Sequence, residues 1–216
     1  MNIRADGSIE SGGKVYTVAQ LKELIPPHKD GEPLTTVQII TAGDVRMGAI
    51  EDVKLELRKI GSLKIQYYSS ATGQDGVTRH MPPFPSTKDA KKSDYPEVIM
   101  PEVKRENFFV VRINSSDRIF FGDKPRQDDE EMLRVGKDFL RKRGKESRFF
   151  YLTVDRGTSY GAYTHMQSLL WQIFEEVRDE KAHEVYGKSL QELTADERSQ
   201  INWMIPLSIV ESSPKG

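Results

Sequence analysis

The feature that most constrains this fold is an internal repeat with a constant offset of 113 residues. Met47-Gly48-Ala49-Ile50 aligns with Tyr160-Gly161-Ala162-Tyr163. The apolar positions that follow keep the same offset: Val53 with Met166, Leu57 with Leu170, and Ile60 with Ile173. Apolar residues spaced by three and four mark one face of a helix, so both copies predict a one-sided helix at the same place. The chain therefore reads as one supersecondary plan used twice.

Each copy predicts the order strand, strand, helix, strand, helix, strand. In the first copy we expect the following elements: an extended segment at Lys14–Tyr16, helices at Val18–Ile25 and Met47–Ile60, and strands at Val37–Ile40 and Leu63–Tyr68. Pro26-Pro27 ends the first helix and Gly61 ends the second, because proline and glycine are common just beyond helix termini.

The second copy carries the same elements and one addition. Its expected strands are Phe108–Ile113, Ile119–Phe121, Phe149–Val154 and Ile205–Val210, and its helices are Asp128–Leu140 and Tyr160–Val177. Phe149–Val154 is apolar throughout, which predicts a strand buried on both faces. An insertion at about 179–203 precedes the last strand, and Thr194 with Glu197 forms a capping-box pattern that opens a further helix in it.

These patterns predict an α+β protein of two tandem modules, each a small mixed β-sheet with two helices packed on one face. We place the first module at 1–70 and the second at 107–216. The intervening 71–106 contains five prolines and many polar residues, so it predicts a linker. Modules of this size bury modest cores, so we expect the two copies to pack together or the chain to form a homodimer.

Composition excludes several classes of function. The 216 residues include no cysteine, and the net charge is −1 from 32 basic and 33 acidic side chains. There is therefore no thiol nucleophile or Cys zinc site, and no basic excess that favours nucleic acid. The four histidines lack metal-ligand spacing, and no Ser/His/Asp arrangement is evident. We expect no enzyme, no metal and no cofactor. Trp171 and Trp203 are expected to pack in a core or an interface.

The loop from Asp155 to Gly161 has two interpretations. As a partner-binding loop at a strand end, it offers Asp155, Arg156 and Tyr160. As a plain strand-to-helix connection, Thr158 or Ser159 caps the helix and the loop has no further role. The second interpretation is favoured. A soluble enzyme built on this loop is a third hypothesis, and it requires a deep pocket that holds several of these side chains.

The order of short motifs resembles the periplasmic domain of ExbD/TolR-type biopolymer transport proteins. Val98-Ile99-Met100-Pro101 is similar to the apolar-x-Pro segment that opens the family's soluble domain. In the second copy Asp155 and Tyr160 have the family's spacing of an Asp and a Tyr after a strand. In the first copy Gly61-Ser62-Leu63-Lys64-Ile65 resembles the passage from helix to final strand.

The chain also departs from that pattern. The first copy has Ala42 at the Asp position and Met47 at the Tyr position, and the second carries the insertion. The family's proton-carrying aspartate belongs to a membrane helix, and no stretch here has the roughly 20 apolar residues such a helix needs. We therefore expect a periplasmic domain whose anchor in the inner membrane lies outside this sequence.

The resemblance implies binding rather than chemistry. Its implied partners are an ExbB/TolQ-like membrane channel subunit and a TonB/TolA-like transducer, in a transport system driven by the proton-motive force. We expect a transducer segment to add to an exposed sheet edge, first at Leu63, Ile65 and Tyr67. The alternative function is binding of peptidoglycan.

Overall fold

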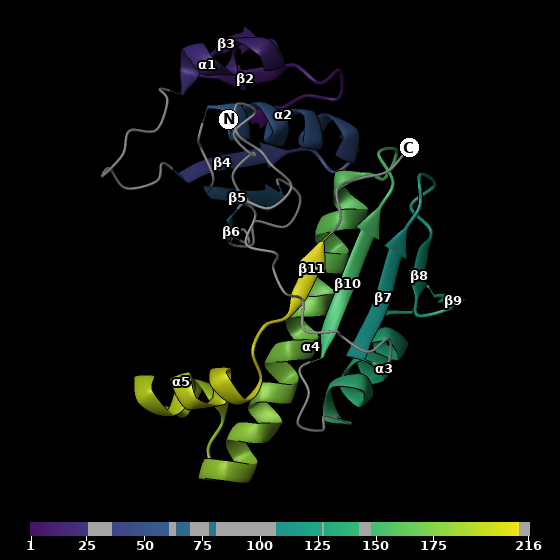
Figure 1. Cartoon of the computed structure of the whole chain (residues 1–216), viewed down its shortest axis with the longest axis vertical. Helices are drawn as coiled ribbons and strands as arrows, with labels where there is room; N and C mark the ends of the chain where they lie inside the picture. Colours follow the sequence, from purple (N-terminus) through teal and green to yellow (C-terminus); the bar gives the residue numbers. More distant parts are fainter. Residues whose placement is uncertain are drawn as a thin grey trace, which may run out of the picture. The chain divides into compact units, whose positions relative to one another are not determined.

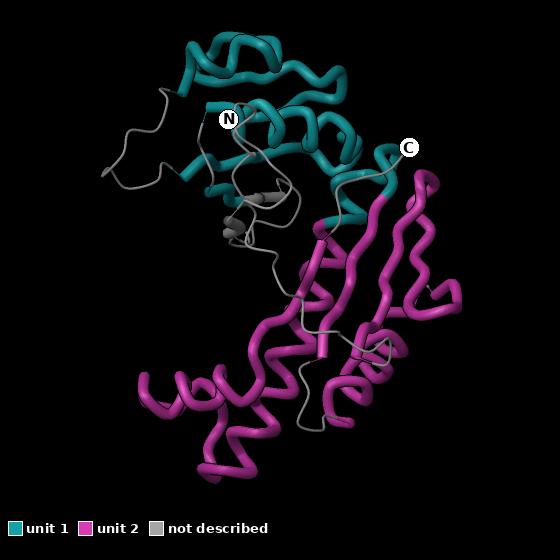
Figure 2. The backbone as a smooth tube through the Cα atoms, viewed as in Figure 1, with its two compact units in different colours: residues 1–102, 155–163, 213–216 teal, residues 103–154, 164–212 magenta. Residues whose placement is uncertain are grey.

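The structure is a computed structural model that describes residues 1–25, 36–60, 64–69, 78–80, 107–126, 128–142 and 148–211, with the backbone alone at 67–69 and 78–80. The chain divides into two compact units (Figure 2). Unit 1 comprises Met1–Glu102, Asp155–Tyr163 and Ser213–Gly216, and unit 2 comprises Val103–Val154 and Thr164–Ser212. Among the helices of the described residues, none combines the length and the apolar character needed to cross a membrane.

Unit 1 contains a six-stranded mixed sheet in the order β3-β2-β1-β4-β5-β6. Its strands are β1 (Asn2–Ile3), β2 (Ile9–Ser11), β3 (Lys14–Tyr16), β4 (Thr36–Thr41), β5 (Lys64–Ser69) and β6 (Thr78–His80). Its helices are the 3₁₀ turn η1 (Val18–Gln20), α1 (Leu21–Leu24) and α2 (Met47–Lys59). β4 runs parallel to both β1 and β5, and the remaining pairs are antiparallel.

The core of unit 1 follows from the two periodicities of its sequence. Residues of β4 alternate between exposed and buried, as expected for a strand with one covered face. The buried face of α2 is a stripe at helical spacing. Side chains with no exposed surface in these elements include Ile39, Ile50, Val53, Leu57 and Ile65.

Unit 2 contains a five-stranded mixed sheet in the order β11-β10-β7-β8-β9. Its strands are β7 (Phe108–Ile113), β8 (Ile119–Phe121), β9 (Lys124–Pro125), β10 (Phe149–Val154) and β11 (Ile209–Glu211). Its helices are α3 (Asp129–Arg141), α4 (Tyr160–Tyr186, whose first four residues count with unit 1), the 3₁₀ turn η3 (Leu190–Glu192) and α5 (Ala195–Met204). β10 is parallel to β7 and to β11.

An aromatic cluster places both long helices of unit 2 on one face of its sheet. The ring of Phe150 on β10 lies 5.5 Å from that of Phe139 on α3 and 5.7 Å from that of Phe174 on α4, centroid to centroid. Phe109 on β7 also contacts Phe139, at 5.2 Å. Because one strand residue touches both helices, α3 and α4 cover the same side of the sheet (Figure 1).

The two sheets have the same plan. In each, a three-stranded antiparallel meander is followed by two strands added in parallel, so β3-β2-β1-β4-β5 corresponds to β9-β8-β7-β10-β11. β4 and β10 span residues offset by 113, and so do the first residues of α2 and α4. The α+β class and the repetition of the element order are confirmed, but each copy begins with three strands instead of the predicted two.

Several details differ from expectation. β10 was expected to be buried on both faces, but its residues alternate between half-buried and buried, so only one face is fully covered. α4 continues past Val177 to Tyr186. Of the predicted linker 71–106, the described part is β6, which joins the first sheet. The compact units also differ from the predicted modules, since Asp155–Tyr163 counts with unit 1.

Candidate partner-binding edges and the paired loops

The strand predicted to receive a partner, β5, has neighbours on both sides. β4 pairs with it in parallel along its full length, including Ile39 opposite Tyr67. On the other side β6 pairs antiparallel with Lys64–Gln66. The expectation of an open edge here is therefore wrong over these three residues, because another part of the chain already supplies the adjacent strand.

The predicted contact residues of β5 have different positions. Ile65 has no exposed surface, so its side chain belongs to the core of unit 1. Tyr67 is placed by its backbone pairing alone, and Leu63 lies outside the described residues. A segment that added to β5 at Lys64–Gln66 would first have to replace β6.

The equivalent strand of the second sheet, β11, differs from β5 in how its edges are paired. It pairs with β10, and within the described residues no strand pairs with its outer edge. The Ser208 carbonyl accepts a hydrogen bond from the Phe150 N–H at 2.9 Å. Since successive residues of a strand direct their N–H and C=O groups to opposite sides, both groups of Ile209 point to the outer edge.

Of the other outer strands, β6 is placed by its backbone alone, and β9 and β3 offer less to an incoming segment. β9 has two residues and one of them, Pro125, lacks the N–H needed for a ladder. β3 lies at the opposite end of the first sheet, and its Lys14 and Val15 are exposed rather than set against a packed surface. β11 is half-buried along all three residues and presents Ile209 and Val210. Of β3, β9 and β11, it is the edge best built for strand addition.

The loop predicted as the second contact region is paired with its counterpart in the first copy, within unit 1. The N–H groups of Met47 and Gly48, which begin α2, donate to the carbonyls of Thr158 and Arg156, each at 2.8 Å. The repeat-related bonds are also present. They run from Tyr160 N–H to the Val45 carbonyl and from Gly161 N–H to the Gly43 carbonyl, both at 2.7 Å.

This exchange supplies hydrogen-bond acceptors for the N–H groups at the start of each helix. The first N–H groups of a helix have no partner within it. α2 has no side-chain cap at Arg46, and the carbonyls of the other loop serve instead. At α4 a hydroxyl adds to the exchange, since Ser159 Oγ accepts from the Ala162 N–H at 3.1 Å. The expected cap by Ser159 is therefore confirmed, and each loop caps the helix of the other.

Glycine allows the two loops to approach this closely. A Cβ at Gly161 would lie 3.1 Å from the Gly43 carbonyl oxygen, and one at Gly48 would lie 3.3 Å from the Arg156 carbonyl oxygen and side chain. A Cβ at Gly43 would make an ordinary contact, 3.5 Å from the Gly161 Cα. The aligned Gly48 and Gly161 are thus the positions where backbone approach leaves least room.

Side-chain and backbone groups of this loop are bonded inside unit 1. Arg156 Nη2 donates to both carboxylate oxygens of Asp52, at 2.8 and 2.9 Å, and Arg46 Nη1 donates to the Gly157 carbonyl at 2.9 Å. Tyr160 has no exposed surface. Asp155 accepts through its carbonyl from the Thr158 N–H and donates through its N–H to the Thr158 hydroxyl. The geometry supports the connecting role of the loop, and Tyr160 is not available to a partner.

Three further findings concern metal sites, pockets and related proteins. Within the parts of the chain that the structure describes, no group of three or more His, Asp or Glu side chains is arranged to hold a metal ion. The pockets described do not collect several of the Asp155–Gly161 side chains, which the enzyme hypothesis requires. Comparison of the chain with protein-family models, curated proteins and solved structures found no match.

Proposed function

We propose that this chain is a periplasmic interaction domain of the ExbD/TolR type, in a biopolymer transport system driven by the proton-motive force. A segment of a TonB/TolA-like transducer adds to the outer edge of β11, and an ExbB/TolQ-like channel subunit is the membrane partner. The observation that carries the proposal is the difference between equivalent edges: β6 fills the edge of β5, while β11 is paired on one side among the described residues.

Strand addition at β11 uses backbone chemistry. The outward N–H and C=O of Ile209 form hydrogen bonds with the incoming strand, each contributing about 0.5–1.5 kcal/mol net. Alternate side chains of the added strand then lie over the two faces of the sheet, which gives selectivity. Because β11 is short, the main-chain bonds at this edge give weak binding by themselves, and side-chain contacts set the final affinity.

The proposal is tested by titrating ¹⁵N-labelled protein with a synthetic peptide from the periplasmic region of a TonB- or TolA-like transducer. We expect shifts of the Ile209 and Val210 amide signals and a smaller effect at β3 and β9. Ile209→Pro removes the outward N–H and leaves the Phe150–Ser208 bond in place, so it should weaken binding about two- to tenfold. Ile209→Ala keeps the N–H and serves as the matched control.

Two outcomes would contradict this function. Amide signals that stay unchanged on every edge strand reject strand addition, and equal binding by Ile209→Pro rejects this edge. Co-sedimentation with purified peptidoglycan in the absence of transducer binding would instead support the glycan-binding alternative. Circular dichroism of each variant confirms that the sheet is intact.

A further inference from the structure

The insertion that separates the second copy from the first is a compact helical platform. It consists of the last turns of α4, η3 and α5, and in Figure 1 it extends beyond the strands of unit 2. Its own small core contains Ala182, Leu190, Leu193 and Ile201, with Tyr186 and Met204 packed against it. Nothing in the first copy corresponds to it, so the repeated fold does not require it.

Hydrogen bonds hold this platform in one shape. The Arg178 guanidinium, which is buried, donates to the Ile205 carbonyl at 3.0 Å and fixes the chain where α5 ends. Asp179 accepts from the Leu190 N–H at 2.7 Å, and Arg198 donates to the Leu190 carbonyl at 2.8 Å. A surface held in this way loses little conformational entropy when it binds a partner.

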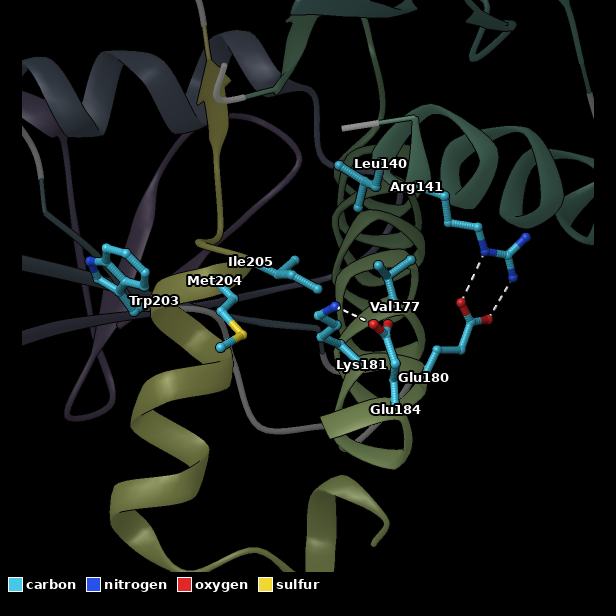
Figure 3. Close-up of a pocket in the computed structure, with 9 residues that line it drawn as sticks. All are labelled: Leu140, Arg141, Val177, Glu180, Lys181, Glu184, Trp203, Met204 and Ile205. Atoms are coloured by element: carbon cyan, nitrogen blue, oxygen red, sulfur yellow. Dashed lines mark hydrogen bonds and ion pairs between the residues drawn. The ribbon is translucent and has the colours of Figure 1, made fainter. Parts of the chain in front are cut away.

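A groove of about 650 Å³ lies between the platform and the end of α3. Leu140, Val177 and Ile205 contribute buried apolar side chains to its lining. Figure 3 shows Trp203 and Met204 on one side of this lining and Arg141 on the other. The groove therefore combines an apolar base with an aromatic side chain at its rim, the arrangement from which proteins build contact sites for peptides.

Trp203 contributes nothing to the platform's own core. Its side chain is 82% exposed, the highest value among the exposed large hydrophobic residues of the described chain. An exposed tryptophan beside an apolar groove costs solubility and offers the side chain most often found at the energetic centre of an interface. Its position therefore points to a contact outside the core.

The charge of the platform decides which partner fits, because the charged residues that line the groove cancel: Arg141 and Lys181 against Glu180 and Glu184. From residue 175 to residue 204 the sequence has eight acidic and four basic side chains, a net charge of −4, although the whole chain is nearly neutral. The α3 segment 129–142 has four of each sign and does not offset this. A negative field on this scale attracts basic segments and repels acidic ones.

The charged groups that line the groove are already paired with one another, but one of these pairs is exposed and can accept a basic partner. Arg141 makes a two-point contact with Glu180, at 2.6 and 2.9 Å, and this carboxylate raises the pKa of Arg141. Lys181 donates to Glu184 at 2.7 Å, but the Glu184 side chain is 67% exposed. An exposed pair of this kind contributes little, so an incoming cation can share Glu184 at small cost.

We propose that this groove binds a basic peptide segment that also carries aliphatic side chains. The aliphatic groups lie on Val177 and Ile205, and a lysine or arginine of the peptide lies on the face of the Trp203 indole. A second basic side chain of the peptide pairs with Glu184. Tryptophan is the best side chain for such a cation–π contact. The site is a second interaction surface, separate from strand addition at β11.

The test uses the full chain and three labelled peptides of twelve residues with blocked ends: four repeats of Lys-Leu-Ser, of Glu-Leu-Ser and of Lys-Ser-Ser. Fluorescence anisotropy should show binding of the first, about tenfold or more weaker binding of the third, and none of the second. Trp203→Ala should weaken binding of the first peptide at least tenfold. Glu184→Gln should weaken it and reduce its salt dependence.

Val15→Ala is the matched control, because Val15 is also an exposed hydrophobic residue and lies on β3, outside the groove. It should leave binding unchanged. Trp203→Phe keeps an aromatic face and should retain part of the affinity. Equal binding of the acidic peptide, or unchanged binding by Trp203→Ala, would overturn the proposal. A dimer of this chain in sedimentation experiments that Trp203→Ala dissociates would also overturn it, because a second copy would then occupy the groove.

Discussion

The contact between α3 and α4 at Gly136 offers the sharpest test of the packing in unit 2. A Cβ built on Gly136 would overlap Cδ1 of Ile173, with Cγ1 at 3.1 Å and Cγ2 at 3.3 Å. Ile173 has no exposed surface, so its side chain has little space into which to move. Gly136→Ala therefore sets a gain in helix propensity against overpacking of a filled core.

The magnitudes predict a net loss for the single change. Replacing glycine by alanine inside a helix gains about 1 kcal/mol. Overpacking a well-filled core typically costs 1–3 kcal/mol. We expect Gly136→Ala to lower the free energy of unfolding by about 1 kcal/mol. Ile173→Val removes Cδ1 and should cost about 1 kcal/mol as a single substitution, through lost burial.

The double variant separates the two effects. With Cδ1 absent, the alanine methyl occupies part of its space and the helix keeps its gain in propensity. We expect Gly136→Ala/Ile173→Val to be within about 0.5 kcal/mol of the original protein, whereas independent changes would add to a loss of about 2 kcal/mol. The coupling between the two sites is then about 1.5–2.5 kcal/mol.

Urea unfolding followed by tryptophan fluorescence measures these values. Both tryptophans, Trp171 and Trp203, belong to unit 2, so the signal reports on the unit that contains the contact. Losses that simply add in the double variant would refute the claim that Cδ1 of Ile173 and the missing Cβ of Gly136 compete for one space. A Gly136→Ala variant more stable than the original would refute it as well.

Three further predictions concern the paired loops and the α4 region. Gly161→Ala should lower the melting temperature more than Gly43→Ala, because its Cβ meets a carbonyl oxygen at 3.1 Å while the other makes an ordinary contact; equal melting temperatures would contradict this order. Thr194→Ala removes the hydroxyl that caps α5 and should lower the free energy of unfolding in urea by about 1 kcal/mol. An unchanged free energy would show that the cap does not stabilise the helix. A hydrogen bond from Lys137 lowers the pKa of Glu176 in the folded protein, so the unfolded chain binds this proton more readily. The free energy of unfolding should therefore fall as the pH drops below about 4.5. Lys137→Met should weaken this pH dependence in acid titrations, and an identical acid profile would show that the Lys137–Glu176 pair does not cause it.

Element type was predictable wherever the sequence carried a strong period. The stripe of Ile50, Val53 and Leu57 predicted α2, and its terminal glycine limited the error at the end of the helix. α4 was predicted too short because the apolar stripe ends at Val177. The helix continues on residues of high helix propensity and stops at Gly187, whose φ of 66° favours glycine. Gly187 therefore marks the end of α4 in the sequence as well.

The site was harder to predict, because edge pairing uses the backbone and leaves little trace in side-chain patterns. β6 is made of Thr78, Arg79 and His80, in a segment rich in proline and polar residues with no alternation to mark a strand. The reciprocal capping of α2 and α4 was equally hidden, since its acceptors are carbonyls. The glycines at 48 and 161 were its only visible signal, and their meaning depends on a contact across more than 100 residues.

Duplication followed by different treatment of equivalent strands accounts for these observations together. Two copies of one fold present two equivalent edges, and two identical open edges expose a chain to self-association. Here the edge of β5 is paired with β6. In the second copy the platform that carries Trp203 is inserted before the equivalent strand, β11. If the proposed strand addition occurs at β11 and β6 protects the first edge, a variant that lacks 70–80 should bind two added segments instead of one. Isothermal titration would then show a stoichiometry near two, and a value that stays at one would mean that β6 is not what closes that edge.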